Sequence, residues 1–328
     1  MVVVLLHWAA AVATGLITAI PFHAGTMGIL GMLFGIMLPL FLMVVLFWRF
    51  AHLAISVRPE RPIHWMIDDV RGVVTDFDRV AGGAIRLLLM VVLVGTFSYF
   101  KSIIPALNEF SWDPLFAEVD RSLIGGHDPY SLLLSVTGTP FMTSVINAAY
   151  HFWLFLVYFI ILLACFAKHD RQSGDTMLLA IALTFILGGN LMATIFSSAG
   201  PVYYGRLGYG DDFAPLMRTL NEFAETSPVW ALNVQDTLWN THAASGPISG
   251  ISAMPSMHMA SSTLLACYGF RYARWAGWLL TGFAVVILIG SVQLAWHYAI
   301  DSYAGAMLAI ILWCVASRIT NRGRCFPG

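Results

Sequence analysis

Eight apolar runs constrain this chain more than any other feature of its sequence. A helix needs about 20 consecutive apolar residues to cross the hydrocarbon core of a bilayer, and runs of roughly that length with few charges predict membrane-spanning helices. The runs therefore predict an all-α, polytopic membrane protein. They cover approximately residues 2–22, 28–50, 84–104, 143–167, 176–198, 256–272, 275–295 and 298–318.

The composition agrees with a lipid environment. Of the 328 residues, 59% are hydrophobic and only 11% are charged, whereas a soluble protein has about 25% charged residues. The net charge of -1 and the lack of a basic run give no support for nucleic acid binding. The four cysteines show neither a disulfide framework nor zinc-ligand spacing. The first apolar run has no Lys or Arg before it, so we interpret it as a retained helix rather than a signal peptide.

Lys and Arg are distributed unequally between the two sides that this topology defines. Thirteen of the 17 fall on one side. Cytoplasmic loops carry the excess of Lys and Arg, so both termini are predicted to be cytoplasmic. The connection 59–83 would then be cytoplasmic and form an interfacial amphipathic helix. The exceptions, on the extracytoplasmic (periplasmic or lumenal) side, are Lys101, Arg121, Arg206 and Arg218.

Two long segments lie on the predicted outer side. Residues 105–140 contain turn-forming residues that separate short helical stretches. Residues 199–254 are rich in Gly, Pro, Asn and aromatic residues. Long structured loops are uncommon unless they are functional, so these segments are predicted to roof a site that a substrate enters from lipid.

Three ionisable residues follow or precede crossings at that same face. His258 stands in Pro255-Ser256-Met257-His258, and His297 is followed by Asp301. Two apolar runs separate the histidines, so the chain returns to the side it left and both can lie at one membrane face. Ionisable residues at a membrane edge suggest a functional site. On a helix, residues four apart are neighbours, so Asp301 can hold one ring nitrogen of His297 and leave the other to react.

The residues before His258 favour a helix start. Pro255 suits a first helical turn, and Ser252 and Ser256 are both possible caps. Free backbone N–H groups and the positive end of the helix dipole make such a position suitable for phosphate.

These motifs resemble the second and third signatures of the type-2 phosphatidic acid phosphatase superfamily. Pro255-Ser256-Met257-His258 and His297-Tyr298-Ala299-Ile300-Asp301 are most similar to the branch that contains inositol phosphorylceramide synthase. The phosphatase branch has an arginine six residues before its second histidine, and this chain has Ser291 there. The phosphatases' first signature is also missing, and Ala199-Gly200-Pro201-Val202-Tyr203-Tyr204-Gly205-Arg206 stands where the synthase-like branch has a Pro- and Tyr-containing motif.

The resemblance implies a domain arrangement. Residues 84–318 would form the six-helix catalytic core, with the outer loops 105–140 and 199–254. Residues 1–58 would add two N-terminal transmembrane helices, 59–83 would connect them to the core, and 319–328 would form a cytoplasmic tail.

The resemblance also implies metal-free phosphoryl chemistry through a phosphohistidine, without a cofactor. His297 would attack phosphorus, Asp301 would orient it, and His258 would protonate the leaving oxygen. Phosphoryl oxygens need positive partners. We expect Arg206 and the N–H groups around Ser256 to bind phosphate, with Lys101, Arg121 and Arg218 as further candidates. Phospholipids, sphingolipids or isoprenyl phosphates would be substrates, with water or an alcohol as acceptor.

Three alternatives compete with this interpretation. An intramembrane serine protease would use Ser252 with His297 as base, but it leaves His258 and Asp301 without a role. A transporter or lipid-binding membrane protein would use the His and Asp side chains as a proton relay, although such sites tend to lie near mid-membrane. A metal site formed by His258, His297 and Asp301 is permitted by their spacing.

Overall fold

The computed structural model describes residues 1–168, 170–245 and 250–321. Every regular element in these residues is helical, which confirms the predicted all-α polytopic fold. Among the described residues, six helices are long and apolar enough to cross a membrane, because their hydrophobic runs reach the length that a bilayer requires. Two further predicted crossings correspond to the shorter helices α1 (Val2–Thr18) and α13 (Met257–Tyr272).

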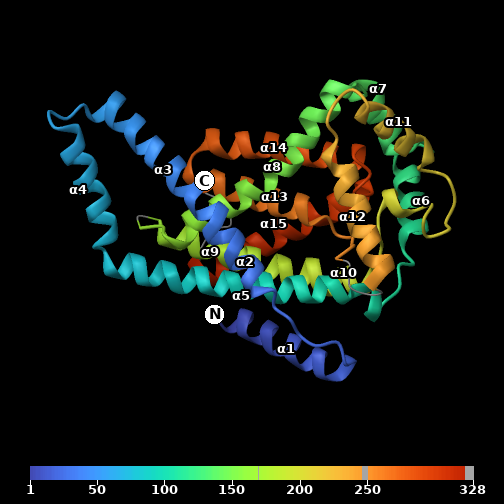
Figure 1. The fold of residues 1–328 in the computed structure, drawn as a ribbon, viewed down its shortest axis with the longest axis horizontal. Coiled ribbons are helices and arrows are strands. Elements are labelled where there is room, and N and C mark those ends of the chain that lie inside the picture. Colours follow the sequence, from blue (N-terminus) through green and yellow to red (C-terminus); the bar gives the residue numbers. More distant parts are fainter. Residues whose placement is uncertain (169, 246–249, 322–328) are drawn as a thin grey trace.

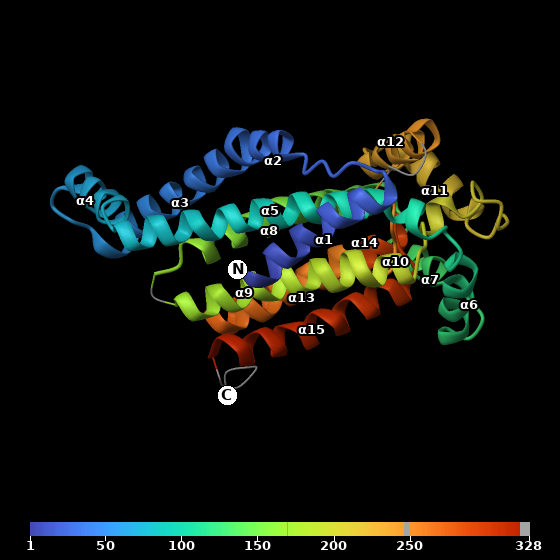
Figure 2. The same ribbon diagram turned by 90° about the horizontal axis from the view of Figure 1, so that it is seen from below.

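The helices that surround α13 lie side by side with it and form the bundle (Figures 1 and 2). One of these helices, α9 (Arg171–Leu183), continues through a π-helical segment, η3 (Thr184–Met192), into α10 (Ala193–Ile195). The bundle consists of α5 (Phe77–Leu107), α8 (Pro140–Cys165), α9 (Arg171–Leu183), α13, α14 (Arg274–Gln293) and α15 (Ala299–Asn321).

Helix α13 is enclosed by the bundle. It packs against α8, α9, α14 and α15, and 11 of its 16 residues are buried. Because neighbouring helices cover it, its surface need not be apolar, and Ser261, Ser262 and Thr263 are buried in it. This enclosure explains why a helix of only 16 residues can hold a central place in the bundle.

A group of short helices, which we call the cap, covers one end of the bundle (Figure 1). Residues 105–140 contribute α6 (Asp113–Leu123) and α7 (Pro129–Thr137), as the predicted short helical stretches. Residues 199–254 form more regular structure than their Gly and Pro content suggested, with the 3₁₀ turn η4 (Pro201–Tyr203), α11 (Ala214–Ala224) and α12 (Trp230–Ser245). Aromatic side chains hold the cap on the bundle, among them Tyr203, Phe213 and Tyr298.

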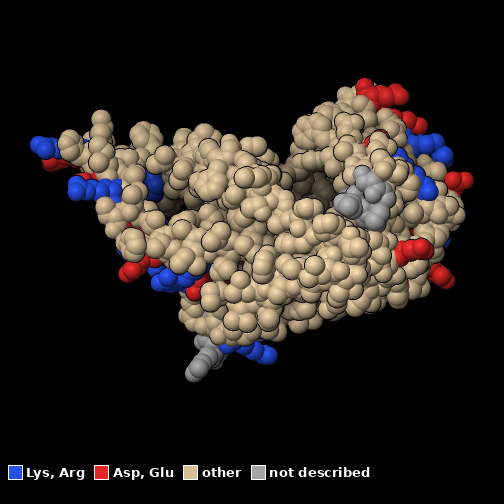
Figure 3. Space-filling model, turned by 60° about the horizontal axis from the view of Figure 1, so that its bottom comes forward, with Lys and Arg blue, Asp and Glu red and all other residues tan. Residues whose placement is uncertain are grey.

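Charged side chains lie at the two ends of the molecule. On the face shown in Figure 3, Lys, Arg, Asp and Glu gather at the cap and at the opposite end, and an uncharged belt separates them. The same view shows a hollow between the belt and the cap. An uncharged belt of this kind suits a protein whose middle lies in hydrocarbon.

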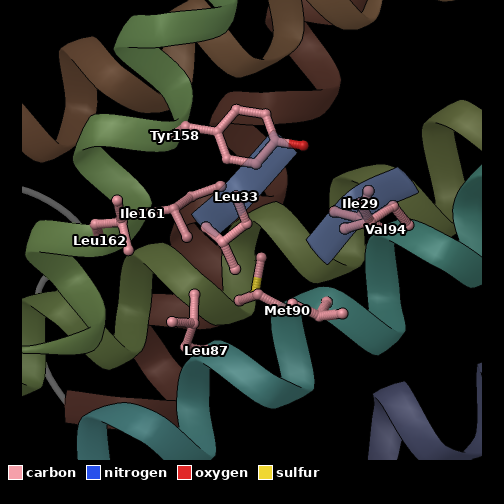
Figure 4. Close-up of a pocket in the computed structure, with 9 residues that line it drawn as sticks. Ile29, Leu33, Leu87, Met90, Val94, Tyr158, Ile161 and Leu162 are labelled. Atoms are coloured by element: carbon pink, nitrogen blue, oxygen red, sulfur yellow. The ribbon is translucent and has the colours of Figure 1, made fainter. Parts of the chain in front are cut away.

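The N-terminal helices pack on the outside of the bundle. Helix α1 lies against α5, where the buried His7 Nε2 lies 3.0 Å from the Asn190 Oδ1 of η3. Helix α2 (Thr26–Met32) continues through η1 (Leu33–Met37) into α3 (Leu38–His52) and η2 (Leu53–Val57). An apolar crevice separates this segment from α5 and α8 (Figure 4), and its lining includes Leu33, Met90 and Tyr158.

The connection between η2 and α5 contains the predicted amphipathic helix. Helix α4 (Pro62–Val74) stands at the end of the molecule opposite the cap (Figure 1). Arg49 of α3 pairs with Asp69 of α4, and its guanidinium lies 5.2 Å from the centre of the Trp65 ring. The next helix, α5, begins at Phe77, earlier than the expected start at residue 84, because Asp76 caps its N-terminus by accepting from the Arg79 N–H.

Candidate active site

Three loops meet beneath the cap and are joined by backbone hydrogen bonds. The Ala253 N–H donates to the Ser198 carbonyl at 2.9 Å, and the Val202 N–H donates to the Ala295 carbonyl at 3.0 Å. The Ser256 N–H donates to the Asp301 carbonyl at 3.0 Å. The segments around residues 198–202, 253–256 and 295–301 therefore form one rigid unit, although they are far apart in the sequence.

His297 lies in this unit and is 6% exposed. Its Nδ1 is 2.9 Å from the carbonyl oxygen of Ala253 and 3.5 Å from Asp301 Oδ2. Both neighbours are acceptors, so this geometry assigns the proton to Nδ1 and leaves a lone pair on Nε2. Burial, and to a lesser extent the positive charge of Lys101, lower the pKa of the His297 imidazole to about 3. A neutral ring with a free Nε2 is the form in which histidine acts as a nucleophile.

Asp301 is completely buried in the first turn of α15. Its Oδ2 accepts a hydrogen bond from the Tyr298 N–H at 3.0 Å. The structure therefore gives Asp301 two functions, because the same oxygen that lies near His297 Nδ1 also holds the start of α15. The Ala253 carbonyl, which sequence reasoning missed, makes the shorter contact with the imidazole. No side-chain pattern can signal a backbone acceptor of this kind.

His258 stands in the first turn of α13, and its ring centre is 6.1 Å from that of His297. Two aromatic residues of α8 contact its ring. The Tyr150 ring is stacked at 4.3 Å and the Trp153 ring is tilted at 4.1 Å. Trp153 is itself held by a 2.8 Å hydrogen bond from its Nε1 to Ser261 Oγ. These contacts restrict rotation of His258 and place it beside His297.

The two expected phosphate-binding residues lie in different surroundings. The Arg206 guanidinium donates to Asp236 at 2.5 Å and lies 5.5 Å from the centre of the Trp239 ring, so it is occupied within the cap. Ser256 is fully buried, and its Oγ caps α13 by accepting from the Met259 N–H at 3.3 Å. Phosphate binding by either side chain stays a prediction, and in this structure each has another partner.

Lys101 is the cation whose charge acts on His297. It lies near the cap end of α5, and its ammonium is 6.0 Å from the centre of the Phe97 ring. Within the described residues no carboxylate forms a salt bridge with Lys101, whereas Arg121 pairs with both Asp128 and Asp212. Of the candidate cations named above, Lys101 is therefore the one that the structure connects electrostatically with the histidines.

Two buried carboxylates of α6 contact the loops of the site, and sequence reasoning missed both. Asp113 accepts from the Ala199 and Gly200 N–H groups and from the Tyr298 hydroxyl. Asp120 accepts from the N–H groups of Ala299 and Ile300. Their spacing of seven residues places them on one helix face, and that face was the available signal.

The geometry bears on the alternative interpretations as well. Across the described part of the chain, no three His, Cys, Asp or Glu side chains are grouped closely enough to hold a metal ion. In the same residues no hydrogen bond joins Ser252 to His297, which a serine protease would require. His258 and His297 lie at helix ends beneath the cap rather than midway along the bundle.

Comparison with known proteins gives one match. A family model described as the PAP2 superfamily matches residues 115–315. The chain matches none of the curated proteins or solved structures with which it was compared. The matched range runs from α6 to α15 and contains His258, His297 and Asp301, which the fold brings together beneath the cap. The chain therefore belongs to the PAP2 superfamily, whose membership indicates a phosphatase- or phosphotransferase-type enzyme.

Proposed function

We propose that this protein is a metal-independent lipid phosphatase or phosphotransferase that acts at the extracytoplasmic face through a phosphohistidine on His297. The observation that carries the proposal is the state of His297. Its Nδ1 is held by the Ala253 carbonyl and lies near Asp301, and its ring centre is 6.1 Å from that of His258. The similarity to the inositol phosphorylceramide synthase branch extends the proposal to sphingolipid head-group transfer.

The reaction proceeds in two steps. In the first, His297 Nε2 forms a bond to phosphorus as the bond from phosphorus to the leaving oxygen breaks. His258, which the negative charge of the bound phosphate favours in its protonated form, gives its proton to that oxygen. The Asp301 carboxylate stabilises the positive charge that develops on the His297 ring. In the second, water or an alcohol attacks phosphorus, the nitrogen–phosphorus bond breaks, and neutral His258 accepts the proton of the attacking hydroxyl.

Lys101 is the cation best placed to attract the phosphoryl oxygens in this proposal. Groups that stabilise charge in the transition state are most effective in a site from which water is excluded. Lys101 acts on His297, has no carboxylate partner within the described residues, and lies in the apolar helix α5. It would supply charge that Ser291, at the position of the phosphatases' arginine, cannot supply.

The substrate and acceptor are identified by direct assay. Purified protein is given a panel of phospholipids, sphingolipids and isoprenyl phosphates, with and without candidate alcohols, and the products are identified by mass. Free phosphate or a free phospho-head group, formed without any alcohol, would indicate hydrolysis. A phosphorylated product that forms only with one of the alcohols would indicate transfer to that alcohol. No product from any phosphorylated lipid would contradict the proposal.

The roles of the histidines are tested by substitution. His297→Ala should abolish turnover and the covalent phospho-enzyme, whereas His127→Ala, an exposed histidine of the cap, serves as the control. His258→Ala should lose more activity on a lipid substrate than on p-nitrophenyl phosphate, because a good leaving group needs little protonation. A phospho-enzyme that persists in His297→Ala would eliminate His297 as the nucleophile.

A further inference from the structure

Helix α6 lies in the cap, outside the bundle, yet two of its carboxylates are buried. Asp113 is 0% exposed and Asp120 is 4% exposed. Within the described residues neither forms a salt bridge with Lys, Arg or His. Burying a charge costs free energy unless hydrogen bonds compensate for the lost water. The hydrogen-bond partners of these carboxylates therefore indicate what the two side chains do in the fold.

Asp120 binds the first turn of α15. Its Oδ2 accepts from the Ala299 N–H at 2.6 Å and its Oδ1 accepts from the Ile300 N–H at 2.8 Å. The first N–H groups of a helix have no partner within the helix and are usually satisfied by a residue just before it. Here Asp120, which lies 179 positions before Ala299, accepts from these N–H groups. Its negative charge also interacts favourably with the helix dipole.

The hydrogen bonds of Asp120 lie next to the proposed nucleophile in the chain. His297 and Tyr298 immediately precede Ala299, and Asp301 lies in the same first turn. Asp113 reinforces the connection because it accepts a 2.9 Å hydrogen bond from the Tyr298 hydroxyl. A shift of the start of α15 would therefore move His297 relative to the Ala253 carbonyl and to His258.

We propose that Asp120 is a positioning residue, which fixes the start of α15 and thereby holds His297 at the angle needed for attack on phosphorus. The inference rests on the proposed function, because it presumes that His297 is the nucleophile. Asp120 itself touches neither histidine through any described hydrogen bond. Since the amides of α15 are already occupied by this carboxylate, the substrate phosphate would instead meet the N-terminus of α13 beside His258.

Burying the Asp120 carboxylate has a free-energy cost, which its two N–H partners offset in part. Burial raises the pKa of Asp120 to about 6, opposed by the hydrogen bonds from its two N–H partners and assisted by the negative charges of Asp301 on α15 and of Asp128 in the cap. The nearby Arg121 is engaged by Asp128 and Asp212. Because the folded protein holds this proton more tightly than the unfolded chain, its stability falls as the pH rises from about 4 to 6. At pH 7 the ionised carboxylate therefore favours folding less than the protonated form would.

The decisive variant is Asp120→Asn, which retains the shape but loses the charge and one acceptor. We expect kcat to fall about 10- to 100-fold, since small displacements of a reacting group can cost about 10²-fold, with KM changed less than about threefold. Vanadate, which imitates five-coordinate phosphorus, should bind more weakly by a similar factor. The unfolding midpoint is measured at pH 7 in parallel, so that kcat is compared for each folded molecule. Glu118→Gln, an exposed carboxylate of the same helix, is the control and should change none of these.

The outcomes separate the two proposals. Normal kcat and vanadate affinity in Asp120→Asn, with His297→Ala inactive, would refute the positioning role alone. A lower midpoint with normal kcat for each folded molecule would also refute it, because the residue would then be only structural. Full activity in His297→Ala would instead overturn the proposed nucleophile.

Discussion

Substituting Gly200 with alanine should damage the active site from a distance. Gly200 has φ +103° and ψ 165°, a combination that is essentially restricted to glycine. A Cβ built there would lie 2.5 Å from the Trp296 carbonyl oxygen and 3.4 Å from the Ala253 Cβ. Trp296 precedes His297, and Ala253 supplies the carbonyl that holds His297 Nδ1. The added methyl group would therefore clash with the carbonyl that immediately precedes His297, while it would only touch Ala253.

The cost has two parts. The backbone conformation contributes about 1–3 kcal/mol, and overpacking against a backbone oxygen that has little room to move contributes about 1–3 kcal/mol more. Gly208 provides the matched control, since its φ is +80° but nothing lies within 4 Å of its Cβ position. Gly208→Ala should therefore show the backbone cost alone. A cost of Gly200→Ala above that of Gly208→Ala is expected from the clash with the Trp296 carbonyl.

The assay compares both variants with the wild type in the same detergent. Unfolding midpoints are measured with turnover of one lipid substrate and with the amount of phospho-enzyme formed. Gly200→Ala should lower the midpoint more than Gly208→Ala and reduce kcat by about 10²-fold, while Gly208→Ala keeps nearly normal kcat. Equal effects of the two substitutions on midpoint and kcat would refute the argument that Gly200 supports His297 through close packing.

Three other predictions follow from the same structure. Lys101→Met should lower kcat/KM by about 10²- to 10³-fold, as loss of a group that stabilises transition-state charge does. Arg206→Met should have a small effect on kcat/KM. A larger loss in Arg206→Met than in Lys101→Met would indicate that Arg206, and not Lys101, binds the phosphate. Activity should survive EDTA and be inhibited by vanadate, and loss on chelation with recovery on adding zinc or magnesium would favour a metal site. In a cysteine-free background, Ser122→Cys should react with an impermeant reagent outside intact cells and Gln172→Cys should not; the opposite labelling would invert the topology.

Several features of this protein depend only on short segments of its sequence. Hydropathy over about 20 residues is sufficient to identify helices that cross a bilayer, because lipid selects on length and apolarity alone. It placed the start of α13 within one residue, since Ser256 and Pro255 are local helix-start signals. The spacing of His297 and Asp301, with an even number of crossings back to His258, predicted that these residues share one membrane face, and the structure brings the two rings to 6.1 Å.

The remaining features arise only when distant segments pack together. Hydropathy did not reveal that residues 199–254 contain α11 and α12, because short cap helices have no membrane-length run. Nor did the sequence indicate that Arg206 would form a hydrogen bond with Asp236. It also gave no sign that the charge of Lys101 in α5 would lower the pKa of His297, almost 200 positions later. The hydrogen bonds from Ala299 and Ile300 to Asp120 likewise join segments with no common local pattern. Residue type and helical spacing are local properties, so the candidate catalytic residues could be predicted from the sequence. Tertiary structure alone decided which backbone carbonyl, carboxylate and cation surround them, because those contacts depend on how the loops and the cap close over the bundle.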